Sequence, residues 1–159
     1  MARGRESGNK MNKIELGGYK RDGFTTINLR DSDVCHDLNK FPYPLKDNSV
    51  DELWMFHTLE HLDNPLGVMR EIWRVCTPGA EVFIKVPHHS INSIKKNPFH
   101  KFDFHEDWFK TFDSTINLGS AFNPTATQCE FRILSIKNTR GKIKFWKMSE
   151  LIILMEILK

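Results

Sequence analysis

The chain has 159 residues, a formal net charge of +3 and 40% hydrophobic residues. This length suits one domain with one core, and so small a net charge gives no argument for a nucleic-acid-binding protein. The cysteines show no paired metal-ligand spacing, and no apolar run approaches the roughly 20 residues that a membrane span needs, so a reduced, cytoplasmic protein is expected.

The first predicted elements are two short strands. Residues 1–10 are polar and basic and precede a second methionine, so we expect a disordered leader ahead of a single domain over residues 11–159. Strands are predicted at Lys13–Leu16 and Thr25–Leu29. The few residues between them are too short for the helix that usually joins parallel strands. The sheet is therefore expected to lack one covering helix.

A strand, a helix and another strand follow. Turn-forming residues at 47–49 precede a predicted strand at Val50–Phe56. Asn64 and Pro65 are typical of a helix start, and an apolar stripe with spacings of three and four continues to Cys76. Alternating residues at Val82–Val86 predict the next strand. This order indicates a parallel βαβ unit, with ligands bound in loops outside the carboxyl ends of the strands.

The last third of the chain predicts a helix, a hairpin and a terminal helix. Residues 89–101 lack a period and are expected to form a loop over the site, and a short helix is expected at Glu106–Phe112. The turn-forming residues Asn138–Gly141 predict a hairpin between strands at 128–137 and 142–148. Ser149 would cap a helix over 150–159, whose wide apolar face must be buried.

Four segments between His36 and Pro87 occur in a recognisable order: HDL, FPYPLKDNSVDEL, FHTLEHLDNP and MREIWRVCTPGAEVFIKVP. In this order they resemble the class I S-adenosylmethionine-dependent methyltransferases, in particular the small branch related to the methyltransferase domain of ubiquinone-biosynthesis enzymes (methyltransferase type 11). The resemblance extends more weakly to Ile14–Gly18 and to HKFDFHEDWFKTF. It implies an α/β, Rossmann-like, mostly parallel sheet with helices on both faces and a C-terminal antiparallel hairpin, abbreviated at the first β-α crossover.

The same resemblance implies a site for S-adenosylmethionine. The residues expected to bind it are Glu15, Gly17, Gly18, Asn28, Asp37, Leu38 and His57. Glu15 would hold the methionine part, and Asp37 with the backbone after it would contact adenine. Tyr19 stands where the family has its final glycine, and Asn28 stands where it has the ribose-binding acid, for which Asp31 or Asp33 is an alternative. An amide accepts through one oxygen only, so weaker cofactor binding is expected.

The segment from His57 to His61 has two interpretations. As H-x-x-E-H it matches a zinc-hydrolase motif, but that chemistry needs a helix of several turns and Asn64 starts a new element, so no metal is expected. In the methyltransferase interpretation, His57 and His61 are the candidate catalytic residues, which orient or deprotonate the acceptor. Alternatively, His61 only packs at the helix entry. His88, next to a strand end, is expected to touch the substrate.

The expected function is methyl transfer from S-adenosylmethionine to an unidentified acceptor, with a small molecule or a sugar favoured. The alternative is a non-catalytic methyltransferase-like binding or scaffold subunit, which Tyr19, Asn28 and the missing helix support. A membrane span and a nucleic-acid partner are not expected. The uncovered sheet face is expected to be covered by the terminal helix or by a second subunit of a homo-oligomer.

Overall fold

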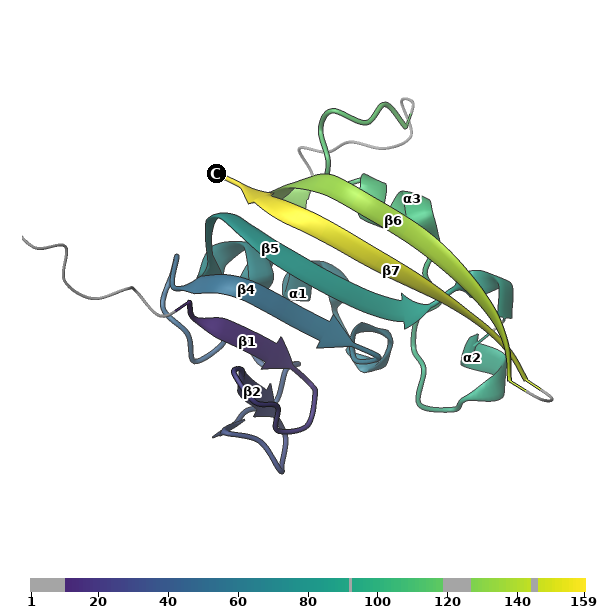
Figure 1. Ribbon diagram of the computed structural model, residues 1–159, viewed down its shortest axis with the longest axis horizontal. Helices are drawn as coiled ribbons and strands as arrows, with labels where there is room; N and C mark the ends of the chain where they lie inside the picture. The colour runs from purple at the N-terminus through teal and green to yellow at the C-terminus, as the bar shows by residue number, and fades with distance from the viewer. Residues whose placement is uncertain (1–10, 92, 119–126, 144–145) are drawn as a thin grey trace, which may run out of the picture.

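A computed structural model describes residues 11–91, 93–118, 127–143 and 146–159 (Figure 1). Seven strands form one sheet in the order β3-β2-β1-β4-β5-β7-β6. Five of them run parallel, and β7 lies antiparallel between β5 and β6. The expected leader at residues 1–10 lies outside the described residues. The mostly parallel sheet with a C-terminal antiparallel hairpin is confirmed.

The βαβ unit at the centre of the sheet agrees closely with the sequence. Strand β4 (Val50–Phe56), helix α1 (Pro65–Val75) and strand β5 (Cys76–Pro87) follow one another, and the two strands pair in parallel. The helix begins at the expected residue because the Asn64 side chain accepts a hydrogen bond of 2.9 Å from the Gly67 backbone N–H. The buried residues of α1, among them Met69 and Ile72, pack against the sheet.

The amino-terminal half of the sheet has short strands that are joined without helices. Strands β1 (Lys13–Leu16), β2 (Thr25–Asn28) and β3 (Val34–Cys35) are short, and β2 ends one residue before the expected Leu29. No helix occurs between β1 and β4, a stretch that the structure describes completely. The sequence indicated one missing crossover helix, whereas three crossovers lack one; the connections from β1 to β2 and from β2 to β3 hold too few residues for a helix.

The helices of the described residues leave one sheet face open. Figure 1 shows α1 and α3 (Glu106–Lys110) behind the sheet. On the opposite face, Trp54, Phe83 and Leu154 lie in register across β4, β5 and β7, and all three side chains are only partly buried. The expected strand arrangement is therefore present, but the expected helices on both faces are not, because no helix of the described residues covers this face. We call it the open sheet face.

The C-terminal hairpin is present, but its turn is not where the sequence placed it. Strand β6 runs over Glu130–Ile143 and β7 over Trp146–Leu158. The segment Asn138–Gly141 lies inside β6, where Asn138 pairs with Leu151 and Gly141 with Met148. The ladder continues to the pair Ile143 and Trp146. Residues typical of a turn were therefore incorporated into a strand, because a long ladder with β7 outweighed their local preference.

The predicted terminal helix over 150–159 is wrong, since these residues belong to β7. Burial alternates from the fully buried Leu151, Ile153 and Met155 to partly buried neighbours, as in a strand. The run LIILMEIL is apolar at helical and strand spacings alike, so periodicity could not separate the two. Pairing with β5 and β6 decided for a central strand, and no terminal helix covers the open sheet face.

An aromatic cluster anchors the segment after β5. Phe104, Phe109 and Phe112 are buried, and Trp108 packs partly buried against the same core. The Phe112 ring meets Phe131 of β6 at 5.8 Å between centroids. A 3-10 turn (η2, His89–Ile91) and helix α2 (Ser93–Lys96) lie in the expected loop. Within the described residues, no helix is long and apolar enough to cross a membrane.

Candidate functional site

The two glycines after β1 form a close contact that no other residue could make. Gly17 has φ +79°, and a Cβ added there would lie 2.2 Å from the Thr58 hydroxyl oxygen, in the loop after β4. A Cβ on Gly18 would lie 2.2 Å from a carboxylate oxygen of Glu15. The backbone at the end of β1 therefore fits tightly between its own strand and the next loop. Such bare backbone at the carboxyl end of β1 suits close approach of a ligand.

Glu15 lies beneath this glycine pair and is ion-paired. Its side chain is almost fully buried, and Arg21 Nε donates to Glu15 Oε2 at 2.5 Å. The Glu15 carboxylate raises the pKa of Arg21 first through this hydrogen bond and then through its charge. The Arg21 guanidinium also lies over the Trp54 ring, 5.1 Å from its centroid. The carboxylate expected to receive the cofactor's ammonium group therefore already holds a cation from the same chain.

Asn28 braces the glycine loop. Its Nδ2 donates to the carbonyls of Gly17 at 3.0 Å and Gly18 at 3.3 Å, and its Oδ1 accepts from the Leu29 N–H at 2.8 Å. The alternative ribose ligand Asp33 accepts from the Thr26 backbone and hydroxyl, which lowers its pKa. Both side chains thus take part in local structure. Donors to two carbonyls are what an amide supplies and a carboxylate cannot.

Asp37 and Leu38 lie just beyond β3. One Asp37 oxygen accepts a hydrogen bond of 3.0 Å from the Asn39 N–H, and the other accepts none from the described residues. Leu38 is buried, and its carbonyl accepts from the Tyr43 hydroxyl at 3.1 Å. This arrangement holds Asp37 at the carboxyl edge of the sheet with one oxygen available. Burial raises the pKa of Tyr43, and the Glu71 charge adds to this effect.

His57 begins the loop after β4 in a left-handed conformation, with φ +49°. Its Nε2 lies 2.9 Å from Glu150 of β7, which also pairs with Lys85 at 2.9 Å. Its Nδ1 lies 3.5 Å from a carboxylate oxygen of Glu60. The Glu60 carboxylate raises the pKa of His57, and the Glu150 charge raises it further. Burial and the Lys85 charge act in the opposite direction but are outweighed. A chain of alternating charges therefore joins this loop to β5 and β7.

The other candidate histidines differ in their surroundings. His61 lies in a 3-10 turn (η1, Leu59–His61), and its Nδ1 is 3.0 Å from the Phe99 carbonyl. His88 is buried, and its ring nitrogens contact the Ser90 hydroxyl at 2.7 Å and Glu106 at 3.2 Å. Nε2 of His88 thus links β5 to α3 through Glu106, while Nδ1 contacts Ser90 in the turn after β5. Its surroundings account for a structural role more readily than for contact with a substrate.

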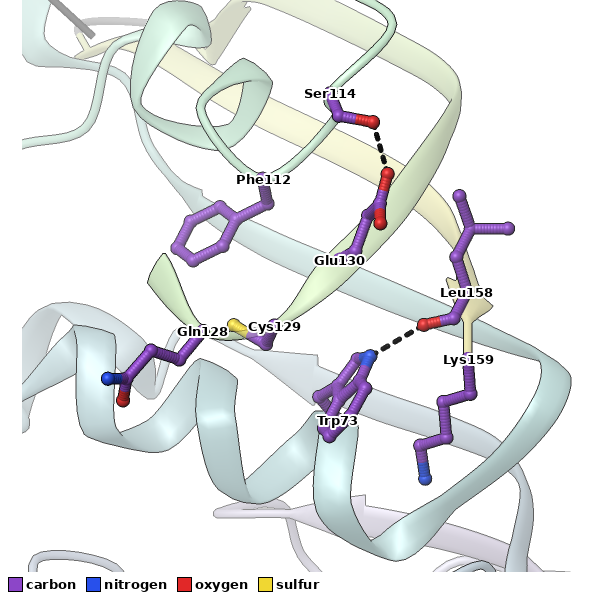
Figure 2. A pocket seen from close by; sticks show the side chains of 8 residues that line it. All are labelled: Trp73, Phe112, Ser114, Gln128, Cys129, Glu130, Leu158 and Lys159. Carbon is purple, nitrogen blue, oxygen red and sulfur yellow. Dashed lines mark hydrogen bonds between the residues drawn. The ribbon is translucent and has the colours of Figure 1, made fainter. Parts of the chain in front are cut away.

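A pocket lies at the opposite end of the sheet from these residues. Its volume is about 540 Å³. Figure 2 shows the side chains that line it: Trp73, Phe112, Ser114, Gln128, Cys129, Glu130, Leu158 and Lys159. The Trp73 indole donates to the Leu158 carbonyl at 2.7 Å, which ties α1 to the last residues of β7. Because these residues lie by the amino end of β5, the pocket is separate from the carboxyl edge where the glycine pair lies.

Sequence reasoning missed four residues that the fold brings to the carboxyl edge. They are Arg21, Thr58, Glu150 and His100. Thr58 belonged to a recognised motif but gave no signal of contact with Gly17. Glu150 was assigned to a helix, which hid its position in β7, where its carboxylate pairs with Lys85 of β5. The contacts of Thr58, Glu150 and His100 join segments far apart in the sequence, so only the folded chain reveals them, whereas Arg21 lies close in sequence to Glu15.

The comparisons with known proteins agree with this architecture. A model of the methyltransferase domain family matches residues 17–84. No curated protein matches the chain. The solved structures it resembles include an S-adenosylmethionine-dependent methyltransferase from Archaeoglobus fulgidus, with a TM-score of 0.61 and 11% identity over 93% of this chain and 86% of that one.

Two more solved structures have the same fold. An S-adenosylmethionine-dependent methyltransferase from Thermotoga maritima gives a TM-score of 0.61 and 13% identity, covering 93% of this chain and 82% of that one. A chain from the complex of the Haloferax volcanii Trm112 methyltransferase activator with a methyltransferase gives 0.63 and 12%, covering 93% and 83%. The chain therefore has the fold of the class I S-adenosylmethionine-dependent methyltransferases, and its residues 17–84 match the methyltransferase domain family.

Proposed function

We propose that the protein transfers a methyl group from S-adenosylmethionine to a small-molecule or sugar acceptor. The observation that carries this proposal is the bare backbone of Gly17 and Gly18 at the carboxyl end of β1, which faces the loop after β4 through Thr58. The crevice at this edge of an open α/β sheet is where such folds bind nucleotides. The domain match begins at Gly17 itself.

The donor groups present fit the parts of this cofactor. Asp37 offers a carboxylate oxygen for an exocyclic amine, and Leu38 is held next to it by the Tyr43 hydroxyl. Glu15 would receive the ammonium group after Arg21 turns away, and Gly17 and Gly18 would let the cofactor approach the backbone. Asn28 would contribute to the ribose end only through the loop it braces. When bound, S-adenosylmethionine supplies a methyl group that is already activated for transfer.

The chain's own contribution would be to position the acceptor and to move a proton. His57 is held by Glu60 and Glu150 at the carboxyl end of β4, and His61 follows one turn later. Either imidazole could accept a proton from an acceptor hydroxyl or amine. Because the Glu60 carboxylate raises the pKa of His57, the neutral ring that can accept a proton is reached only at a higher pH than in a free histidine. His88 stays in the proposal only as a residue at the base of the loop formed by residues 89–101.

The test of the proposal is calorimetric titration with S-adenosylmethionine and S-adenosylhomocysteine. Binding is expected, and Asp37→Ala should weaken it by about 1–3 kcal/mol because a charge-assisted hydrogen bond is lost. The exposed Asp22→Ala is the matched control, expected to bind as the wild type does. A folded wild-type chain that binds neither compound would favour the alternative, a non-catalytic scaffold with a degenerate cofactor site.

The homo-oligomer is part of the same proposal and rests on the open sheet face. The partly buried row Trp54, Phe83 and Leu154 lies between an acidic row, with Glu81 on β5, and a row with Lys85 on β5. A two-fold axis along the apolar row would place each acidic row opposite the lysine-bearing row of the second copy. We infer that a second copy of this chain covers the face. The three cysteines are unpaired, which agrees with the cytoplasmic location we propose.

A further inference from the structure

Glu60 is a fully buried acid without a hydrogen bond to its side chain. Its exposed fraction is 0%, and neither carboxylate oxygen accepts a hydrogen bond from the described residues. The nearest cationic group is His57, whose Nδ1 lies 3.5 Å from Glu60 Oε1. A buried carboxylate is costly unless hydrogen-bonded or bound to a cation. Something beyond the described contacts is needed to explain why this position holds an acid.

His61 is oriented so that it can donate an electron pair toward this carboxylate. Its Nδ1 lies 3.0 Å from the Phe99 carbonyl, and since a carbonyl only accepts, this nitrogen carries the proton. The lone pair of the neutral ring is then on Nε2, which lies 4.0 Å from Glu60 Oε1. Metal-binding histidines are commonly fixed in this way, with the distal N–H donating to a backbone carbonyl.

His100 reaches the same place from a distant part of the chain. The Lys101 and Phe102 backbone N–H groups donate to the Glu60 carbonyl at 2.7 and 3.3 Å, which fixes the segment carrying His100 against η1. Its ring meets the His61 ring at 4.7 Å between centroids, and its Nδ1 is buried without a hydrogen-bond partner among the described residues.

We propose that Glu60, His61 and His100 bind a divalent transition-metal ion. One donor atom from each lies within 4.8 Å of the others. In a tetrahedral zinc site with bonds of about 2.0–2.2 Å the donor atoms are roughly 3.5 Å apart. Side-chain rotations that move the donor atoms by about 1 Å would therefore bring the three ligands to this spacing. Two imidazoles and one carboxylate suit Zn²⁺, Fe²⁺, Co²⁺ or Mn²⁺ better than Ca²⁺ or Mg²⁺. The half-exposed His57 and His61 side chains leave a route from solvent.

This site differs from the zinc hydrolase that the motif suggested. In that interpretation the first and last histidines of H-x-x-E-H bind zinc from one helix, and the glutamate acts as a base. Here His57 has a left-handed backbone and contacts Glu150, so the acid becomes a ligand and His100 supplies the second imidazole. If the proposed function holds, the ion lies in the loop after β4, where its free coordination positions would take an oxygen or nitrogen of the acceptor.

The test is titration of the metal-free, tag-free full chain with Zn²⁺ and Mn²⁺ by calorimetry, with thermal unfolding measured alongside. We expect one ion per chain and a metal-dependent rise in the unfolding temperature. Glu60→Gln and His100→Ala should each weaken binding by at least tenfold and abolish the rise. His89→Ala is the matched control, because it removes an exposed histidine outside the cluster and should leave both readouts unchanged.

Three results would overturn the proposal: no binding by the wild type, tight binding retained in Glu60→Gln, or binding lost equally in His89→Ala. Each would leave the pair of Glu60 with His57 as a purely structural contact. If one variant fails to fold, the Co²⁺ absorption spectrum of the wild type decides, since a tetrahedral site with two imidazoles absorbs strongly in the visible range and an octahedral aquo ion does not. Metal binding without S-adenosylmethionine binding would support this site and reject the proposed function.

Discussion

At the scale of single residues, Asn28 shows how a departure from a family pattern can acquire a structural role. The sequence alone suggested that an amide in place of the ribose-binding acid only weakens the cofactor site. The structure shows that this amide donates to both glycine carbonyls at the end of β1. A carboxylate cannot donate, so restoring the family's residue would remove two hydrogen bonds and place a negative charge next to two carbonyls.

We therefore predict that Asn28→Asp destabilises the protein by about 1–3 kcal/mol, the usual cost of unsatisfied buried partners. The sequence by itself predicts the opposite, a gain in cofactor affinity. Chemical denaturation measures the free energy of unfolding, and titration with S-adenosylhomocysteine measures the affinity. Asn39→Asp serves as the control, since that exposed side chain uses only its oxygen, which accepts from the Asp63 N–H. Tighter cofactor binding by a stable Asn28→Asp would show that the loop relaxes when ligand binds.

At the scale of elements, the chain after β5 is held to the hairpin through Asp113. This buried acid accepts a 2.8 Å hydrogen bond from the Ile133 N–H of β6 and two more from Thr115. Burial acts to raise the pKa of Asp113, but these hydrogen bonds outweigh burial and lower it. The aromatic cluster around α3 depends on this link, because Phe112 contacts Phe131 in the same strand.

We predict that Asp113→Asn costs about 1–3 kcal/mol at neutral pH, because a charged acceptor is replaced by an amide with one acceptor oxygen. Since the folded-state pKa is depressed, the stabilisation is present above the unfolded-state value of about 4 and is lost as pH falls through the folded-state value. The difference between wild type and variant should therefore shrink from pH 7 to pH 3. Denaturation curves at a series of pH values test this, with Asp22→Asn as the exposed control. A pH-independent difference would mean that Asp113 acts by packing alone.

At the scale of the whole molecule, the sheet has one face covered by helices and one that is open. Three crossovers without helices and a terminal strand in place of a helix produce this asymmetry. The row from Trp54 to Leu154 is only partly buried on that face. A partly exposed row of this kind on a central sheet is typical of an interface.

Size-exclusion chromatography with light scattering should therefore find a dimer of the wild-type chain. Leu154→Lys should convert it to a monomer, because a charge would replace an apolar side chain at the centre of the interface. Glu81→Lys should weaken the dimer, and the double variant Glu81→Lys/Lys85→Glu should restore part of it, since the two rows face each other. Leu29→Lys, at an exposed apolar residue outside this face, should remain dimeric. A monomeric wild type would mean that another partner covers the face.

The strand from Val50 to Phe56, the helix start at Pro65 and the motif order from His36 to Pro87 could all be predicted from the sequence. Each depends on neighbours a few residues apart: a turn before a strand, a capping side chain or an apolar stripe on one helix face. The first strand likewise follows from its local pattern, and the absence of a helix after it follows from the few residues between the first two strands. The candidate residues Glu15, Gly17, Asp37 and His57 were also found in this way, because the family pattern is local.

Only the tertiary structure decided the last strand, the position of the hairpin turn and the contacts of the candidate site. The run from Leu151 to Leu158 fits either a helix or a strand until its pairing partners are known, and Asn138–Gly141 forms a turn only if no longer ladder competes. Glu60, His61 and His100 meet because backbone hydrogen bonds join segments some forty residues apart. Such long-range contacts carry no local pattern, so their chemistry becomes visible only when the chain is folded.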